Sequence, residues 1–441
     1  MEYITEMQST LMVEVSELHQ YAGRVVRING VIHRIREMSG FAFVILRTKR
    51  DLLQCVYSTD KAQCNLDTVV EECAVIIEGE VVLDQRVMHG AEIHIINIKI
   101  LSKPVESLPV IINKKKLDIP LDTNLAYRSI SLRNPHERAI FKVQEGIVRG
   151  FREYLLKQNF TEIRTPKIVF AGAEGGANIF KLDYFGKKVY LAQSPQFYKQ
   201  TMVGVFERVF EVAPVYRAEK HDTSRHLNEY VSMDFEMGFI NDFKEIMQME
   251  TGMLKYVFEL LDTEYCNELE LLNVKVPQIE SIPAVKFMDA KNIIVNEFGR
   301  KITDYHDFEP EEEQLLCEYA KKKFNSDFIF VTHYPSSKRP FYAMEDKYDP
   351  DYTLSFDLLY NGLEVTTGGQ RIHDYNEQVE KMVKRGMNPE EFESYLMVHK
   401  SGIPPHGGLG IGLERLTMKF LGLSNVRNAC LFPRDMNRVT P

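Results

Sequence analysis

Residues 404–422, PPHGGLGIGLERLTMKFLG, join a glycine-rich segment directly to an amphipathic helix pattern. Glycines leave the backbone open to close approach by a ligand, and apolar residues at helical spacing follow them. The helix begins with Glu414 and Arg415, and the planar guanidinium of Arg415 is suited to stacking on an aromatic ring. This stretch predicts a nucleotide-binding site at the start of a helix.

An upstream segment supplies polar residues in strand alternation. Residues 210–239 read FEVAPVYRAEKHDTSRHLNEYVSMDFEMGF, in which the odd positions put Arg217 and Glu219 on one strand face. The even positions of the returning strand align Tyr230, Ser232, Asp234 and Glu236, and the polar loop between the strands adds Arg225 and His226. Carboxylates in such alternation are costly unless they bind something, which favours a site over a salt-bridged surface hairpin.

A second hairpin is expected within residues 354–374, LSFDLLYNGLEVTTGGQRIHD. Asn-Gly at 361–362 is a strong two-residue turn signal, which places Leu359 opposite Glu364 and Asp357 opposite Thr366. Asp357 and Glu364 then share a face, and paired carboxylates near a hydroxyl suit Mg²⁺. A hairpin with outward acids is the alternative, and the Gly-Gly pair and arginine that follow favour the site.

The first hundred residues read as five short strands separated by turn-forming or charged residues. Five such strands are typical of a small Greek-key barrel of the oligonucleotide-binding (OB) kind. Phe41 and Phe43 lie two apart on one strand, and Gln54 is on the next, so one face could stack a base while an amide reads its edge. The alternative, that both phenylalanines belong to the barrel core, stays open.

The remaining chain predicts one larger domain, in an α+β protein overall. Residues 106–133 carry prolines and a lysine triplet with little periodicity, as a hinge between residues 1–105 and 134–441 would. Asn134 and Pro135 are good first residues for an amphipathic helix that we expect to end near Gln158. The following FTEIRTPKIVF contains Pro166, which belongs at a sheet edge or an interface.

Composition bounds the class of protein. A chain of 441 residues with 44% apolar composition can bury more than one core, and no uninterrupted apolar stretch approaches a membrane span. The N-terminus lacks a leader pattern, so we expect a cytoplasmic protein with no membrane association. The net charge of −9 argues against a nucleic-acid partner on average, although local basic runs permit a basic face. The six cysteines show no metal-ligand spacing and no disulfide framework.

Taken together, residues 210–239 and 404–422 resemble motifs 2 and 3 of the class II aminoacyl-tRNA synthetases, and residues 160–170 resemble motif 1, the dimer-forming element. Over essentially the whole chain, the sequence resembles the aspartyl-tRNA synthetases of the short, archaeal and eukaryotic-like type. The resemblance implies an OB-fold anticodon-binding domain, a catalytic domain with an antiparallel sheet flanked by helices, ATP and Mg²⁺ as cofactors, and a homodimer.

The resemblance also implies roles at the ATP site. Arg217 would contact the α-phosphate, and Tyr230 with Arg415 would sandwich the adenine. Glu219 belongs to the ATP-binding set, and Arg225 and His226 would lie near the distal phosphates. Glu364 with Thr367 would hold the metal, beside Asp357, which the hairpin places on the same face. Relatives usually carry serine where Thr367 stands, which keeps the hydroxyl.

A further set of residues concerns the amino acid. LAQSPQFYKQ, residues 191–200, resembles the aspartyl signature, so Lys199 with Arg371 would clamp the side-chain carboxylate of L-aspartate. Asp234 would help to hold that lysine or the substrate. Gln196 would reach the ammonium group of the substrate. Glu174 lies in the glycine-rich loop AGAEGGANIF, which resembles the loop that closes over the amino acid.

In the barrel, Arg36, Phe43 and Gln54 match positions that relatives use to stack and read anticodon bases. His33 is expected where relatives strict for tRNA(Asp) carry tryptophan and relatives that also charge tRNA(Asn) carry histidine, which implies relaxed specificity. A second marker position, Met88, is uninformative. The alternative, an exposed barrel histidine without a role, stays open.

The expected function is therefore an aspartate–tRNA ligase that charges tRNA(Asp) and also tRNA(Asn). Two alternatives stay in view: an asparaginyl-tRNA synthetase, which we expect to lack a lysine at Lys199, and a synthetase-like RNA-binding protein without catalysis, which commonly loses an ATP-site residue. A paralogue that makes asparagine typically lacks the barrel.

Overall fold

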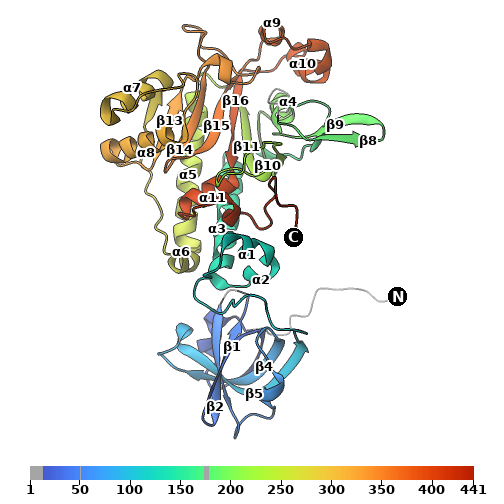
Figure 1. Cartoon of the computed structure of the whole chain (residues 1–441), viewed down its shortest axis with the longest axis vertical. Coiled ribbons are helices and arrows are strands. Elements are labelled where there is room, and N and C mark those ends of the chain that lie inside the picture. The colour runs from blue at the N-terminus through green and yellow to red at the C-terminus, as the bar shows by residue number, and fades with distance from the viewer. Residues whose placement is uncertain (1–12, 50, 173–177) are drawn as a thin grey trace. The chain divides into compact units, whose positions relative to one another are not determined.

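The computed structural model describes residues 13–49, 51–172 and 178–441. The chain forms two compact units, Met1–Lys115 and Lys116–Pro441 (Figure 1). Each unit has its own buried apolar core. The loop residue Glu174, predicted to close over the amino acid, lies outside the described residues.

The first unit is a closed five-stranded barrel, as predicted. Its strands pair in the order β1-β2-β3-β5-β4. Their bounds are β1 Val25–Met38, β2 Phe41–Arg47, β3 Leu52–Ser58, β4 Ala74–Leu83 and β5 Ala91–Ser102. Buried and outward residues alternate along β3 and β4, and Val44, Cys55 and Ile77 are fully buried inside the barrel. In these strands every second side chain fills the interior, and the others are available on the outer surface.

The second unit is built on an eight-stranded sheet in the order β12-β13-β14-β15-β16-β11-β10-β6. Neighbouring strands from β13 to β10 are antiparallel, as predicted, and the strands at the two edges pair in parallel. The bounds are β6 Thr161–Glu162, β10 Arg208–Tyr216, β11 Glu229–Gly238, β12 Ala284–Lys286, β13 Phe328–Thr332, β14 Ser355–Tyr360, β15 Glu364–Arg371 and β16 His406–Gly412.

The segment around Pro166 divides between two sheets. Thr161 and Glu162 form the edge strand β6, and the chain past the proline joins a separate three-stranded sheet in the order β7-β9-β8. These strands are β7 Ile168–Val169, β8 Lys181–Tyr184 and β9 Lys187–Leu191. The predicted edge position of this segment is confirmed, because proline has no N–H to donate to a central ladder.

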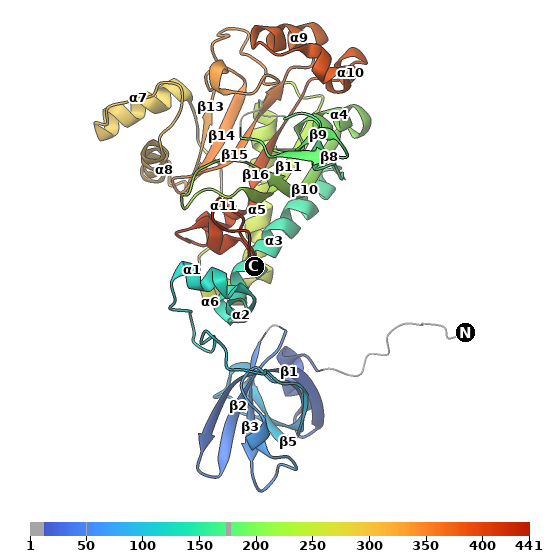
Figure 2. The same cartoon turned by 45° about the vertical axis from the view of Figure 1, so that its right-hand side comes forward.

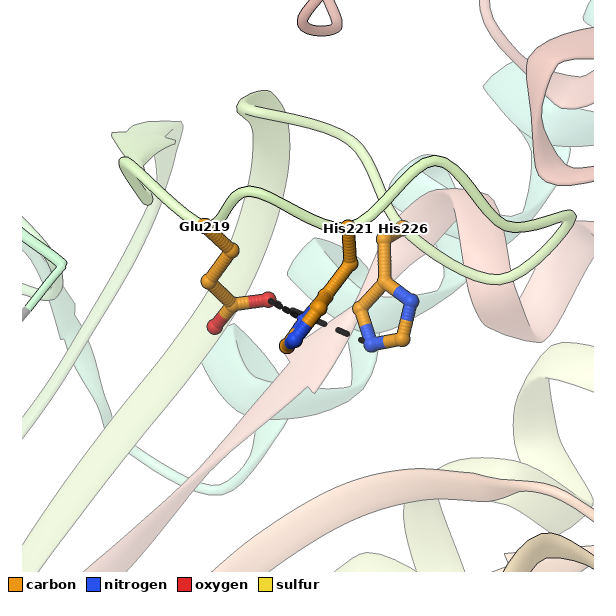
Figure 3. Close-up of side chains that lie close together, drawn as sticks. All are labelled: Glu219, His221 and His226. Carbon is orange, nitrogen blue, oxygen red and sulfur yellow. Dashed lines mark ion pairs between the residues drawn. The ribbon is translucent and has the colours of Figure 1, made fainter.

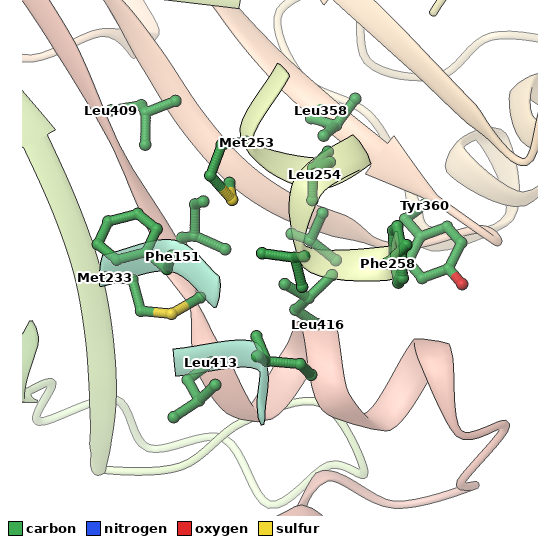
Figure 4. Close-up of a cluster of buried hydrophobic side chains, with 14 of the residues drawn as sticks. Phe151, Met233, Met253, Leu254, Phe258, Leu358, Tyr360, Leu409, Leu413 and Leu416 are labelled. Atoms are coloured by element: carbon green, nitrogen blue, oxygen red, sulfur yellow. The ribbon is translucent and has the colours of Figure 1, made fainter. Parts of the chain in front are cut away.

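Helices α3 and α5 supply much of the core under the large sheet. Asn134 caps α3 (Pro135–Lys157) by accepting from the backbone N–H groups of His136 and Glu137, so the predicted helix is confirmed at both ends. Figure 4 shows Phe151 of α3 in one apolar cluster with residues of α5 (Lys244–Glu264), the sheet and α11 (Leu413–Phe420). This layer fixes the large sheet from below and leaves its opposite face for chemistry.

The other helices are shorter and surround the sheet. Helices α7 and α8 lie beside β13 in both views (Figures 1 and 2). None of the helices in the described part of the chain combines the length and apolar character needed to cross a membrane. Their bounds are α4 Gln196–Phe206, α6 Cys266–Leu272, α7 Phe287–Phe298, α8 Pro310–Phe324, α9 Tyr375–Lys384 and α10 Glu393–Lys400.

Two further helices, α1 (Leu121–Ala126) and α2 (Arg128–Ser131), form inside the range predicted as a hinge. Arg128 is fully buried and donates to the backbone carbonyls of Cys430 and Leu431, about 300 residues later in the chain. Such long-range contacts give no local periodicity, which is why the sequence pattern showed no helix here.

A buried carboxyl lies beneath the sheet. Oε1 of Glu250, on α5, accepts a hydrogen bond of 2.5 Å from Thr366 of β15, and Oε2 has no hydrogen-bond partner among the described residues. Burial, assisted by the charge of Asp357, raises the pKa of Glu250 to about 8. Glu250 is therefore protonated in the folded chain at neutral pH.

Replacement of this carboxyl, Glu250→Gln, should change how stability depends on pH. The folded state keeps the proton up to about pH 8, whereas an ordinary glutamate loses it near 4.5. Unfolding thus releases a proton between these values, and wild-type stability falls as pH rises through that window. The variant should gain on the order of 4 kcal/mol relative to wild type between pH 5 and 8.5. Urea unfolding at several pH values measures this, and parallel curves for the two proteins would contradict it.

Candidate active site

The large sheet carries a cavity of about 790 Å³ on the face opposite α3 and α5. Every residue predicted for ATP, aspartate or the metal lines it, apart from the undescribed Glu174. These residues are Gln196, Lys199, Arg217, Glu219, Arg225, His226, Tyr230, Asp234, Asp357, Glu364, Thr367, Arg371 and Arg415. Segments separated by more than 200 residues in sequence thus meet in one place.

Glycines of β16 make room for the polar row on β11. Gly408 pairs with Glu236 and Gly410 with Asp234 across the two strands. A Cβ at Gly408 would lie 2.1 Å from the carbonyl oxygen of Phe235 and 2.2 Å from Glu236 Oε2. No side chain larger than hydrogen fits there, so glycine at this position keeps the Glu236 carboxylate in place.

A buried network of opposite charges forms the floor of the cavity. Lys199 Nζ, on α4, lies 3.0 Å from Asp234 Oδ1 and 3.3 Å from Glu236 Oε2, and it donates to the carbonyl of Leu409 at 2.9 Å. Arg371 Nε, on β15, donates to Glu236 Oε1 at 2.8 Å. The structure thus brings together the two predicted cations, and Asp234 contacts Lys199, which is one of its two expected roles.

Glu236 joins the two cations and is fully buried. Burial alone would raise the pKa of this carboxyl, but Arg371 and Lys199 outweigh burial and hold the pKa below its ordinary value. Alternation placed Glu236 on the site face in the sequence, yet no role was assigned to it. Its role is to fix both cations, since a carboxylate between them restrains each side chain.

The hairpin at 361–362 forms with a different register from the one predicted. Leu359 pairs with Glu364 as expected, but Asp357 pairs with Thr367 and not with Thr366. A β-bulge at the start of β15 adds one residue to that strand, which turns Thr366 into the core and Thr367 toward the cavity. A hairpin signal fixes the turn and carries no information on a bulge further along the strand.

The bulge improves the candidate metal site. Thr367 Oγ1 donates to Glu364 Oε1 at 3.1 Å, and Asp357 lies across the strand pair from Thr367. Burial first, and then the charge of Glu364, raises the pKa of Asp357 to about 6, although Arg339 lies 2.8 Å from its Oδ1. Two carboxylates that line the same cavity, with a hydroxyl beside one of them, fit a hard divalent cation.

The other end of the cavity carries the residues predicted for ATP. Arg415 Nη1 donates to the backbone carbonyl of Glu364 at 3.2 Å, and Tyr230 lines the same cavity. The next residue, Glu414, is buried and accepts a hydrogen bond from the backbone N–H of Val231, which ties α11 to β11. A base between Tyr230 and Arg415 would therefore be held by two elements that are locked to each other.

Arg225 has a partner that sequence analysis missed. It pairs with Glu313 of α8, whose pKa burial raises to about 7 in spite of the arginine. Arg339, which contacts Asp357, was also missed. Glu313 lies in a run of glutamates typical of a helix N-terminus, and no pattern in the sequence connects it with a loop 88 residues earlier.

The barrel presents the predicted polar and aromatic residues on one outer face. Arg36 pairs with Phe43 across β1 and β2, and Gln54 pairs with Ile45, two residues further along β2. Ala42 and Val44 are buried instead, so Phe43 is not part of the closed core. The ring of Phe43 packs edge-on against Phe41, with 5.3 Å between centroids, and Gln54 Nε2 donates to Glu92. This face suits base stacking beside an amide and a cation.

His33 is buried, unlike the exposed barrel histidine that was the alternative to a specificity marker. It is only 5% exposed, because a β-bulge in β1 between Ile32 and Arg34 turns two consecutive residues inward. Its Nδ1 lies 3.2 Å from Arg47 Nη1, and Arg47 forms a bidentate pair with Glu72. The ring contacts a buried ion pair, and it is therefore not positioned to stack directly on an RNA base.

Two family models match the two units. The model for tRNA synthetases class II (D, K and N) matches residues 120–436, and the model for the OB-fold nucleic acid binding domain matches residues 26–101. The first match covers more than half of the chain and includes every described residue of the cavity.

Full-length relatives agree with the family models. The chain is 46% identical over 432 residues to the aspartate–tRNA(Asp/Asn) ligase of Thermus thermophilus, covering 98% of this chain and 100% of the relative. It is 45% identical to the enzyme of the same name from Deinococcus radiodurans, covering 96% and 98%. The solved asparaginyl-tRNA synthetase of Pyrococcus horikoshii with asparaginyl-adenylate superposes with a TM-score of 0.89 at 30% identity, covering 96% and 97%. The cavity, the barrel and these similarities together show that the chain belongs to the class II tRNA synthetases of the D, K and N group.

Proposed function

We propose that this protein is an aspartate–tRNA ligase. The observation that carries the proposal is the buried pair of cations, Lys199 and Arg371, held side by side on Glu236 at the floor of the cavity. A substrate carboxylate there accepts hydrogen bonds from two charged donors. The neutral amide of asparagine brings no negative charge to balance the two cations. The relatives named for aspartate at 45–46% identity support the same substrate.

Activation needs positioning and charge stabilisation more than proton transfer. An oxygen of the aspartate α-carboxylate attacks the α-phosphorus of ATP, the bond from that phosphorus to the bridging oxygen breaks, and pyrophosphate leaves. Arg217 stabilises the charge that develops on the α-phosphate, while Tyr230 and Arg415 fix the adenine. Gln196 lies in the same cavity as Lys199, where it would reach the substrate ammonium group. No general base is required, because the attacking carboxylate is already ionised.

In the second step a hydroxyl at the 3′ end of tRNA attacks the acyl carbon of the adenylate. The new ester bond forms as the bond to the phosphate oxygen breaks, and AMP leaves. The departing phosphate can take the hydroxyl proton, so the protein again supplies position and charge.

Glu364, Thr367 and Asp357 would hold Mg²⁺. The fit rests on the position of Asp357 and Glu364 in one cavity and on the Thr367 hydroxyl, which donates to Glu364. When bound, this ion would neutralise phosphate charge on ATP. The family uses ATP, and the cavity offers Arg225 and His226 for its distal phosphates.

We further propose that the enzyme charges both tRNA(Asp) and tRNA(Asn), working in the cytoplasm where these RNAs and ATP are present. Support comes from the relatives whose names include both tRNAs, each matching nearly the full chain. The outer face that carries Arg36, Phe43 and Gln54 would read the anticodon. His33 would influence that reading indirectly, by holding Arg47 inside the barrel.

A homodimer through the segment that includes β7 is part of the proposal. Ile168 and Phe170 are 46% and 50% exposed, and apolar side chains of this size exposed together suit a partner surface. Light scattering of the protein in solution tests this assignment: a monomer at micromolar concentration would contradict it.

Arg217→Ala should abolish adenylate formation while leaving tRNA binding intact. Loss of the guanidinium removes charge stabilisation at the α-phosphate, so aspartate-dependent ATP–pyrophosphate exchange should fall at least about 100-fold. Arg86→Ala, which removes an exposed arginine of the barrel, is the matched control and should leave exchange unchanged. Exchange by the Arg217 variant within about threefold of wild type would remove Arg217 from the mechanism.

Charging of purified tRNA(Asp) and tRNA(Asn) with labelled aspartate tests the substrate and the tRNA range separately. We expect aspartate on both RNAs and no transfer of labelled asparagine to either. Aspartate on tRNA(Asp) alone would overturn relaxed specificity and leave the ligase assignment standing. No transfer of aspartate would overturn the assignment itself.

A further inference from the structure

The loop between β10 and β11 carries a cluster that the proposed reaction does not fully use. Glu219, His221 and His226 each offer one ligand atom, and these three atoms all lie within 4.8 Å of one another (Figure 3). Glu219 Oε2 lies 4.0 Å from His221 Nδ1 and 3.9 Å from His226 Nε2. One carboxylate and two imidazoles are the ligand set of many zinc sites.

We propose that Glu219, His221 and His226 bind a divalent transition metal such as Zn²⁺, and that this metal and ATP exclude each other. Three protein ligands leave one position of a tetrahedral ion for water, so the site would be open and reversible. Imidazole nitrogens favour zinc, copper and nickel over the Mg²⁺ of the phosphate site. The two metal sites therefore differ in ligand chemistry as well as in position.

Metal binding requires a modest contraction of the cluster. Zinc bonds of about 2.0–2.1 Å put tetrahedral ligand atoms about 3.3–3.5 Å apart, so the contacts at 3.9 and 4.0 Å need to shorten by roughly half an ångström. The two imidazole nitrogens lie within 4.8 Å of each other and need to approach by at most about 1.5 Å. His221 is exposed, with 62% of its side chain accessible, and its side chain has room to make this adjustment. Figure 3 shows both imidazoles on the same side of the loop as the Glu219 carboxylate.

The backbone around the cluster is already fixed. Asn228 Nδ2 donates to the carbonyls of Arg217 and Glu219, at 2.7 and 3.0 Å, and the N–H of Arg217 donates to the carbonyl of Asn228 at 2.9 Å. These bonds join the two ends of the loop at its base. Glu219 is thus held at a defined place from which the two histidines can be approached.

The orientation of His226 also suits a ligand. Thr223 Oγ1 lies 2.6 Å from His226 Nδ1, and donation from Nδ1 to this hydroxyl leaves the Nε2 lone pair directed at the cluster. A hydrogen bond on the far nitrogen is the usual support of a metal-bound histidine. Burial, followed by the charge of Arg415, lowers the pKa of His226, so the ring is neutral and able to coordinate at neutral pH.

Mutual exclusion follows from the shared residues. Glu219 and His226 line the active-site cavity and belong to the proposed ATP-binding set, whereas His221 is not among the described residues that line it. A metal held by all three would occupy the two side chains that ATP needs. This exclusion rests on the proposed function, but binding of the metal does not.

The test is titration of the full-length protein with ZnCl₂ by calorimetry in the absence of nucleotide, for wild type, His221→Ala and His19→Ala. His19 is an exposed histidine of a short helix, Val15–Tyr21, in the first unit, outside the cluster. Loss of a residue that only hydrogen-bonds a metal ligand lowers metal affinity about 10–100-fold. Loss of the ligand His221 itself should therefore weaken zinc binding on the order of 100-fold or more. His19→Ala should bind zinc as wild type does. Equal zinc binding by wild type and His221→Ala, or no zinc binding by wild type, would overturn the proposal.

The same proteins report on exclusion through ATP–pyrophosphate exchange at fixed free zinc. His221→Ala should show wild-type exchange without zinc. With zinc, wild type should show a KM for ATP raised by about tenfold at unchanged kcat, and His221→Ala should resist this effect. Chelation of zinc by ATP affects both proteins equally. If zinc binds but inhibits wild type and His221→Ala equally, the exclusion is overturned. If none of the three proteins shows exchange, the proposed function has failed, and calorimetry still reports whether the metal binds.

Discussion

The buried contact between Glu236 and the two cations, Lys199 and Arg371, is the constraint on which the rest of the site depends. Taking four charges of this kind out of water is costly, and the arrangement persists only when each charge has a partner. Asp234 supplies the fourth charge, and the carbonyls of Gly408 and Leu409 take further donors. The glycines of β16 are therefore part of the electrostatics, because only they leave space for the carboxylates.

This constraint links fold to substrate choice. Strand β11 supplies the carboxylates, α4 supplies the lysine and β15 supplies the arginine, so three elements must be in place before the floor of the cavity exists. The helices beneath the sheet hold these strands through apolar contacts, and their buried Glu250 contacts Thr366 on the core side of the sheet, away from the cavity. A carboxylate that enters such a pocket meets two restrained donors, and restraint lowers the entropy cost of recognition.

Features that depend on residues close together in the chain were predicted correctly from the sequence. Alternation in β11 placed Asp234 and Glu236 on the site face, and the cap at Asn134 located α3, because both depend on residues close in the chain. The two bulges, at His33 and at the start of β15, were not predictable, since an extra residue in a ladder has no compositional signal. Ion pairs between residues far apart in sequence, such as Arg225 with Glu313, also could not be predicted from the sequence.

The central claim is that the floor of the cavity selects a carboxylate over an amide. Its most direct measurement is the affinity of the wild-type protein for non-hydrolysable analogues of aspartyl-adenylate and asparaginyl-adenylate, compared by calorimetry. The two analogues differ in one group, so their difference isolates the contacts of Lys199 and Arg371. The account predicts that the aspartyl analogue binds tighter by a factor on the order of 1,000 or more. Equal affinities, or a preference for the asparaginyl analogue, would contradict it.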